Sequence, residues 1–176
     1  MMQTFQFGPW KIAASEIFYI SKLSLGLVNY KPIVPGRMCT VVYVLVLPRR
    51  VVPRFADLTS EEVTDLFHSA HTIAAVVEKE YKGESLTITL QDGPQAGQTV
   101  PHVHVHLIPR RAGDWANNDD IYGEIDQKEK ELAKELKRKT AAVDNEERKP
   151  RTPEDMASEA AALRKLFAQA ENIWSA

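Results

Sequence analysis

Three histidines alternate with aliphatic residues in one short stretch, HVHVHLI. They are His102, His104 and His106, and Val103, Val105 and Leu107 fill the gaps. Successive side chains of a β-strand point to opposite faces of the sheet. The stretch is therefore predicted to be a strand with all three imidazoles on one face and the aliphatic side chains on the other. We expect the aliphatic face to be buried in a core and the imidazole face to look into a cleft.

The loop before this stretch has the composition of an anion-binding loop. Residues Asp92–Pro101 include two glycines, two prolines and the short polar side chains Gln95, Gln98 and Thr99. A loop of this kind can bring backbone N–H groups close to an anion. A row of histidines beside such a loop suggests chemistry on a phosphate group.

Three interpretations of the histidine row compete. A purely structural role is disfavoured because three adjacent imidazoles on one face are costly to bury and to keep neutral. Three neutral imidazoles could bind zinc, but the sequence offers no obvious fourth ligand, so no metal site is predicted. The favoured interpretation is nucleophilic catalysis, in which the middle imidazole attacks phosphorus and its neighbours contact the phosphate oxygens or the leaving group.

Composition restricts the class of protein. The chain has 176 residues, of which 44% are hydrophobic and 26% charged, and its formal charge is −2. These values are typical of a single globular domain and give no reason to expect a nucleic-acid or membrane partner. One cysteine allows no intrachain disulfide, and no signal peptide or membrane span is predicted. We expect a cytoplasmic location, which is also compatible with entry into the nucleus.

Hydrophobic patterns predict the main elements. The run Val41–Leu47 fits a central strand buried on both faces, and Ser85–Gln91 fits a strand that pairs antiparallel with the histidine strand. A capping box, Thr59 with Glu62, opens a long helix with one apolar stripe. We predict a main domain over 1–123 with its core at about 5–113.

The rest of the chain is predicted from charge and capping. Residues 124–151 contain 17 charged side chains out of 28, which indicates a charged linker or a solvated helix. Residues 152–174 are predicted to form a C-terminal helix, capped by Thr152, that docks on the domain.

The motifs resemble those of the histidine triad superfamily, and in particular its fragile histidine triad branch of dinucleoside triphosphate hydrolases. The resemblance covers roughly residues 5–125. It rests on the following segments: HVHVHLI, Gln91-Asp92-Gly93-Pro94, Ala96-Gly97-Gln98-Thr99-Val100, Pro109-Arg110, Phe5-x-Phe7-Gly8 and Leu27-Val28-Asn29-x-Lys31-Pro32. It implies an α+β fold: a five-stranded antiparallel sheet with one long helix packed on it and a C-terminal helix, in a homodimer.

The resemblance also implies a reaction: diadenosine triphosphate and water give AMP and ADP through a covalent histidine–AMP intermediate. It assigns His104 as the nucleophile, supported in position by His102. It assigns contacts to the phosphates to Gln91, Gly97, Gln98, Thr99, Val100 and His106, and a contact to the ribose to Asn29. No tightly bound cofactor is expected. Mg²⁺ or Mn²⁺ is expected to accompany the substrate, because the loop Asp92–Pro101 has no Lys or Arg to neutralise it.

The chain departs from the family pattern at two places. Trp10 stands where the family commonly has a histidine, and it is expected either to stack on an adenine or to be a core aromatic. After Pro35-Gly36 the chain is about six residues longer than the pattern, so that Arg37–Val42 align as an insertion and Tyr43 takes the place of a further histidine. We predict weakened catalysis from this second departure.

Two other functions remain open on the sequence. One is hydrolysis of another nucleotidyl substrate, such as adenosine phosphosulfate or an AMP phosphoramidate. The other is a slow-turnover nucleotide-binding signalling protein, in which the bound dinucleotide complex is the signal. The rate of turnover discriminates between them.

Overall fold

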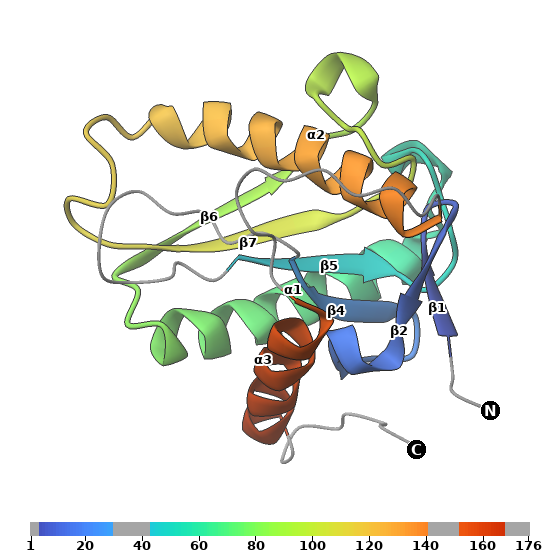
Figure 1. The fold of residues 1–176 in the computed structure, drawn as a ribbon, viewed down its shortest axis with the longest axis horizontal. Coiled ribbons are helices and arrows are strands. Elements are labelled where there is room, and N and C mark those ends of the chain that lie inside the picture. Colours follow the sequence, from blue (N-terminus) through green and yellow to red (C-terminus); the bar gives the residue numbers. More distant parts are fainter. Residues whose placement is uncertain (1–3, 30–42, 141–151, 168–176) are drawn as a thin grey trace.

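A five-stranded antiparallel sheet forms the centre of the computed structural model, which describes residues 4–29, 43–140 and 152–167 (Figure 1). In spatial order the strands are β3 (Ile17–Ile20), β4 (Ser24–Val28), β5 (Val44–Pro48), β7 (Val105–Arg110) and β6 (Ser85–Leu90). Every neighbouring pair is antiparallel. The α+β class and the five-stranded antiparallel sheet predicted from the sequence are thereby confirmed.

The two central strands carry the functional stretch and its support. All five residues of β5 and all six of β7 are buried, as a strand between two covered faces requires. The predicted pairing of β6 with the histidine strand is confirmed, with His106 opposite Thr89. His106 also lies opposite Leu45 of β5. Residues 41 and 42 of the predicted central strand lie outside the described residues.

The N-terminal segment forms a hairpin. Strands β1 (Thr4–Phe7) and β2 (Trp10–Ala13) pair antiparallel across a turn at Gly8-Pro9. Gly8 has a φ of +58°, and a Cβ atom there would lie 3.0 Å from Val100 Cγ1, so this turn favours glycine. Trp10 is 8% exposed and belongs to the hydrophobic core, which identifies it as a core aromatic.

Helix α1 (Ser60–Glu80) covers one face of the sheet. The predicted capping box is present: Thr59 accepts a hydrogen bond from the Glu62 N–H, and Glu62 accepts one from the Thr59 N–H. The apolar stripe packs against β4, β5 and β7 and consists mainly of Leu66, Ala70, Ile73, Ala74 and Val77. His68 and His71 are exposed on this helix.

Helix α2 (Asp120–Thr140) lies over the other face, so that the sheet is enclosed between two helical layers (Figure 1). The sequence predicted a charged linker or solvated helix over 124–151. Residues 124–140 form a helix that is solvated on its outer side only. The inner side of α2 carries four buried aliphatic residues, Ile121, Ile125, Leu132 and Leu136. They belong to the same core cluster as Phe7, Ile12 and Leu27. Residues 141–151 lie outside the described residues.

Helix α3 (Pro153–Leu166) packs beside β3 (Figure 1). Thr152 caps it through the Asp155 N–H, as predicted. Arg164 donates hydrogen bonds to the carbonyl oxygens of Ile17 at 2.7 Å and Ala14 at 2.6 Å. Phe167 contacts Phe18 and Tyr19. Residues 168–174 of the predicted C-terminal helix lie outside the described residues.

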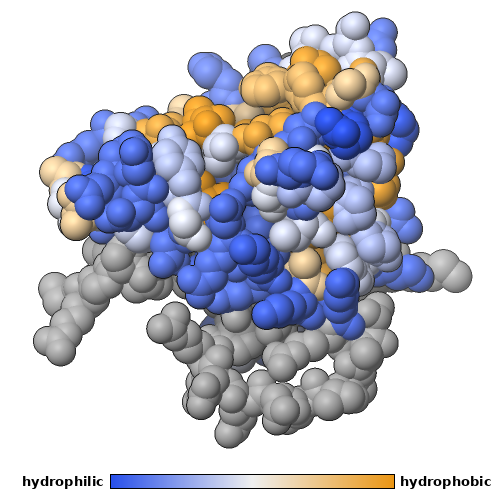
Figure 2. Space-filling model, turned by 90° about the horizontal axis from the view of Figure 1, so that it is seen from above, coloured by the Kyte–Doolittle hydropathy of each residue, from blue (hydrophilic) through white to orange (hydrophobic). Residues whose placement is uncertain are grey.

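The surface on the α2 side is mostly hydrophilic, with one hydrophobic band (Figure 2). The charged outer side of α2 accounts for part of this pattern, because Lys130, Lys134 and Lys137 are exposed there. Among the described helices, none combines the length and the low charge needed to cross a bilayer.

Candidate active site

The three histidines lie on the α2 side of the sheet and are all fully buried, with 0% exposure. Val103, Val105 and Leu107 belong to the core cluster on the α1 side, so the predicted alternation of faces is observed. Two details differ from the prediction. Regular strand pairing begins only at Val105, and the predicted open cleft is covered by α2, whose apolar stripe is buried there.

His102 connects three parts of the fold. Its Nδ1 accepts a hydrogen bond from the Gly8 N–H at 3.0 Å, and its Nε2 lies 2.9 Å from the Pro48 carbonyl oxygen and 3.1 Å from that of Arg50. Nε2 must therefore carry the proton, because a carbonyl only accepts. Burial, with a smaller effect of His104, lowers the pKa of His102 to about 4 and keeps the ring neutral.

His104 is oriented by the backbone of His102. Its Nδ1 lies 2.7 Å from the His102 carbonyl oxygen, so Nδ1 carries a proton and Nε2 is the position for a lone pair in the neutral ring. Nε2 lies 3.0 Å from Oε1 of Glu129. Burial alone lowers the pKa of His104, but the charge and hydrogen bond of Glu129 outweigh burial and raise it. A carboxylate oxygen only accepts, so in this conformation Nε2 of His104 carries a proton that it donates to Glu129.

His106 is supported by Tyr43. The Tyr43 hydroxyl is hydrogen-bonded to Nδ1 of His106, and the two rings are stacked with centroids 5.3 Å apart. Burial, and then the charge of Glu129, raise the pKa of Tyr43, so its hydroxyl keeps the proton. Burial, with a smaller effect of His104, lowers the pKa of His106 to about 3, so its ring is neutral and carries one proton. Because Nδ1 accepts the hydrogen bond from Tyr43, that proton lies on Nε2. The insertion Arg37–Val42 lies outside the described residues.

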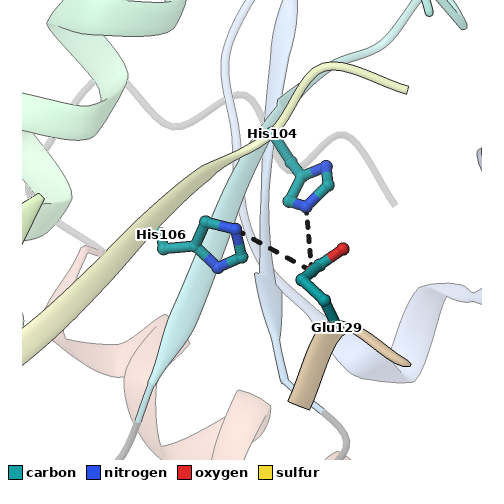
Figure 3. Close-up of side chains that lie close together, drawn as sticks. All are labelled: His104, His106 and Glu129. Atoms are coloured by element: carbon teal, nitrogen blue, oxygen red, sulfur yellow. Dashed lines mark hydrogen bonds and ion pairs between the residues drawn. The ribbon is translucent and has the colours of Figure 1, made fainter. Parts of the chain in front are cut away.

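Glu129 of α2 is buried at the centre of the site, between His104 and His106 (Figure 3). Besides His104, its carboxylate accepts a hydrogen bond from the Thr99 hydroxyl at 2.9 Å and one from the Thr99 N–H at 3.4 Å. Burial would raise the pKa of Glu129, but His104 and the other partners lower it to about 2. A fully buried anion is thus held by an imidazole, a hydroxyl and a backbone N–H.

The residues of the loop before the histidines differ in what they contact. Gln91 donates from Nε2 to Asp126 of α2 at 2.7 Å. Gly97 has a φ of +92°, and a Cβ atom there would lie 2.9 Å from Oδ1 of Asp126, so glycine allows α2 to approach. The Gln98 side chain accepts a hydrogen bond from the Gly93 N–H and donates one to the Pro53 carbonyl oxygen.

Two further predicted site residues lie beneath the loop and beside α2. Val100 is a fully buried core residue, so any phosphate contact there would come from its backbone. Asn29 is buried next to a small cavity. The same cavity is lined by Phe7, Ile12, Leu27, Leu132, Leu136 and Met156.

Sequence reasoning missed Glu129 and Asp126. A signal was present: Ile121, Ile125, Leu132 and Leu136 recur at helical steps, and Glu129 occupies the one interruption in that stripe. A carboxylate in line with apolar residues points toward the core rather than toward solvent.

The same groups have the chemistry of a metal ligand set. His104, His106 and Glu129 each offer one ligand atom, and these atoms lie within 4.8 Å of one another. Two imidazoles and a carboxylate suit zinc. The 3.0 Å separation of His104 Nε2 and Glu129 Oε1 is that of a direct hydrogen bond. With a proton on Nε2, the imidazole and the carboxylate are each other's hydrogen-bond partner.

Comparison with known proteins is consistent with this geometry. The HIT domain family model matches residues 11–113. The chain is 46% identical over 164 residues to the bifunctional bis(5'-adenosyl)-triphosphatase/adenylylsulfatase of Arabidopsis thaliana, over 93% of this chain and 84% of that protein. It is 46% identical over 171 residues to the bis(5'-adenosyl)-triphosphatase of Dictyostelium discoideum, over 97% and 98%. The crystal structure of the C. elegans NitFhit protein matches with a TM-score of 0.67 and 39% identity, over 93% of this chain and 30% of that one.

Proposed function

We propose that this chain, which belongs to the HIT domain family, hydrolyses diadenosine triphosphate to AMP and ADP. Two relatives that match most of the chain are named as bis(5'-adenosyl)-triphosphatases. The observation that carries the proposal is at His104. Its Nε2 lies 3.0 Å from Oε1 of the Glu129 carboxylate, and Thr99 binds the other oxygen of that carboxylate. The nitrogen assigned as the nucleophile therefore faces an anion that neighbouring donors hold in place, as attack on a bound phosphate requires.

The chemistry proceeds in two displacements at His104. The lone pair of neutral Nε2 attacks the phosphorus next to one adenosine, a P–N bond forms, the P–O bond to ADP breaks, and ADP leaves with the electron pair. Water then attacks the same phosphorus. The P–N bond breaks, its electron pair returns to Nε2, AMP leaves, and the protons of the water pass to solvent.

The neighbouring groups stabilise the phosphoryl oxygens during both steps. His106 directs its Nε2–H toward the anion position, and Thr99 offers a hydroxyl and a backbone N–H. Donors that are fixed before the reaction lower the barrier without the cost of reorganising solvent. His102 acts through position, because its carbonyl oxygen holds the Nδ1–H of His104.

A short exposure to diadenosine triphosphate followed by mass spectrometry tests the nucleophile. We expect an AMP adduct on His104 in the wild type. The His104→Asn variant should show no adduct and a kcat lower by about a thousandfold or more, with AMP binding still measurable. His68→Asn, on the exposed side of α1, is the matched control and should behave as the wild type. Equal hydrolysis by the wild type and His104→Asn would contradict the mechanism.

A second substrate is favoured by one relative. The Arabidopsis thaliana protein is also named an adenylylsulfatase, and adenosine phosphosulfate would give the same AMP adduct with sulfate as the leaving group. The ratio of kcat/KM for the two substrates decides which is preferred. If hydrolysis is slower than dissociation of the bound dinucleotide, the result would instead support a signalling role.

We also propose that Mg²⁺ or Mn²⁺ accompanies the substrate. The cation beside the phosphate loop, Arg54, is already paired with Asp92 at 3.0 Å. The charge of a triphosphate therefore needs a partner from solution.

The proposed assembly is a homodimer formed at the β6 edge of the sheet. Strand β6 is the last in the sheet order, and no described strand pairs with its outer edge. Ile88 on this strand is 53% exposed. An edge strand with an exposed aliphatic side chain is a common site of association between subunits.

A further inference from the structure

We propose that helix α2 is a built-in competitive inhibitor of the active site, whose carboxylates occupy the positions of the substrate's phosphates and which must move away before substrate binds. The inference rests on the proposed function, since it names the regulation of the same site. It concerns two carboxylates on one face of α2, Glu129 and Asp126, and their contacts with the residues assigned to phosphate binding.

The contacts of the two carboxylates match those expected of the substrate. Glu129 binds the nucleophile His104 and the Thr99 hydroxyl at 3.0 and 2.9 Å. Asp126 binds Gln91 at 2.7 Å. The two acidic residues are three positions apart and so lie on the same side of the helix, about 5–6 Å from each other. One helix thus presents two negative charges to three of the side chains that would hold a polyphosphate.

The leucines of α2 cover the neighbouring apolar space. Leu132 and Leu136, on the turns after Glu129, line the small cavity beside Asn29 together with Phe7 and Leu27. Binding sites for flat heterocycles are typically apolar with a few polar groups, and Asn29 is the residue expected to contact the ribose. The helix therefore occupies nucleoside space as well as phosphate space.

The site is closed to substrate in this conformation. His104 is 0% exposed and Glu129 is 0% exposed, so a dinucleotide cannot reach Nε2 while α2 is in place. Nε2 of His104 also donates a hydrogen bond to Glu129 at 3.0 Å in this conformation, so its lone pair is not available for attack.

The connection between β7 and α2 provides a place for movement. Arg110, the last residue of β7, binds Asp114 at 2.6 Å and Asn118 at 3.1 Å, which fixes the start of this connection to the sheet. Gly113 within it has a φ of +74°, and no atom lies within 4 Å of a Cβ built there. The helix can therefore swing from a firmly anchored base.

The imitation of phosphate is incomplete at His106. The carboxylate gives one oxygen to His104 and one to Thr99, and the Nε2 of His106 is left 3.8 Å from Oε1. This nitrogen has no hydrogen-bond partner among the described residues although it is buried. A phosphate has a further oxygen to offer it. Leaving a buried donor unpaired is costly, so a phosphate ester has an advantage over Glu129 at this position.

Glu129→Gln tests the proposal by steady-state kinetics with diadenosine triphosphate. A neutral amide competes less well for His104, so the closed form is less populated and apparent affinity rises. We expect KM to fall about tenfold with kcat unchanged or higher. Asp126→Asn, which changes an exposed residue outside the histidine triad, is expected to lower KM in the same direction by a smaller factor. Glu131→Gln is the matched control, because Glu131 accepts hydrogen bonds from Gln127 and Lys128 of the same helix; its KM should match that of the wild type.

Two kinetic outcomes would overturn the proposal. If Glu129→Gln lowers kcat tenfold or more at unchanged KM, Glu129 serves the reaction rather than blocking it. If both KM and kcat stay within twofold of the wild type in Glu129→Gln and Asp126→Asn, the contacts of these two carboxylates do not regulate the enzyme.

Binding of AMP, a ligand that needs no turnover, separates this proposal from the proposed function. Calorimetry should show tighter AMP binding to Glu129→Gln than to the wild type. Hydrogen exchange should show faster exchange of the α2 amides when AMP is added to the wild type, because the helix is displaced; slower exchange would overturn the proposal. If no variant hydrolyses diadenosine triphosphate but these AMP effects are seen, the proposed hydrolase function is rejected and the inhibitory role of α2 is kept.

Discussion

Each of the three imidazoles has its proton placed by a different neighbour. Carbonyl oxygens fix Nε2–H in His102 and Nδ1–H in His104, while the Tyr43 hydroxyl leaves the proton of His106 on Nε2. In the mechanism that we propose, the row is a nucleophile flanked by a positioning ring and a donor. The alternation in the sequence predicted which face the rings share. It could not predict the proton positions of His102 and His106, because these depend on groups far away in the chain: the carbonyl oxygens of Pro48 and Arg50 and the hydroxyl of Tyr43.

Tyr43, which the resemblance to the family places at the position of a histidine, has a defined role in the structure. Weakened catalysis stays a prediction, but the support for His106 is not simply lost, since Tyr43 both stacks on the ring and binds Nδ1. Position 43 is covered in the interior, with 1% exposure, where a polar group needs a partner.

Tyr43→Phe tests that support. Removing the hydroxyl leaves Nδ1 of His106 buried without its donor, which costs about 1–3 kcal/mol of stability. The proton of His106 is also no longer confined to Nε2, so kcat should fall several-fold while KM changes little. Chemical denaturation and steady-state kinetics measure the two effects. An unchanged kcat would show that the hydroxyl does not set the tautomer of His106.

At the scale of elements, the sequence predicted the sheet and helix α1 well because their signals are local. Alternation identified β6 and β7, and a capping box with a regular stripe identified α1. Helix α2 was harder, because its high charge outweighs four aliphatic residues in any average over the segment. Its buried glutamate is stabilised by Thr99, His104 and His106, which lie some 23 to 30 residues away in the chain. Such a contact leaves no periodic signal.

The docking of α3 makes a prediction at the same scale. Phe167 is 2% exposed and packs between Phe18 and Tyr19. Phe167→Ala should lower the free energy of unfolding by about 3–5 kcal/mol, since it leaves a cavity where a ring was buried. Phe67→Ala is a matched control, because Phe67 on α1 is 44% exposed, and it should cost about 1 kcal/mol or less. Similar losses in both variants would show that α3 is not docked as described.

For the whole molecule, two helical layers leave the sheet with its edges as the surfaces open to further pairing. We expect the wild type to sediment at about twice the 19.8 kDa of one chain. Ile88→Lys places a charge on the exposed side of β6 and should shift the protein toward the monomer, because lysine on an edge strand opposes association. Ala75→Lys, at an exposed position of α1, should leave the dimer intact. A dimer that tolerates Ile88→Lys would place the interface elsewhere.

The unpaired Nε2 of His106 has a consequence for which molecules in a cell can activate the protein. A carboxylate is flat and has two oxygens, so a metabolic acid that enters the site can only repeat the two contacts that Glu129 already makes. A tetrahedral oxyanion reaches the third donor as well. Organic acids, however abundant, would gain nothing by displacing α2, and phosphate or sulfate esters would. The position of Nε2 of His106 thus lets the site discriminate nucleotides from carboxylic acids of the same charge.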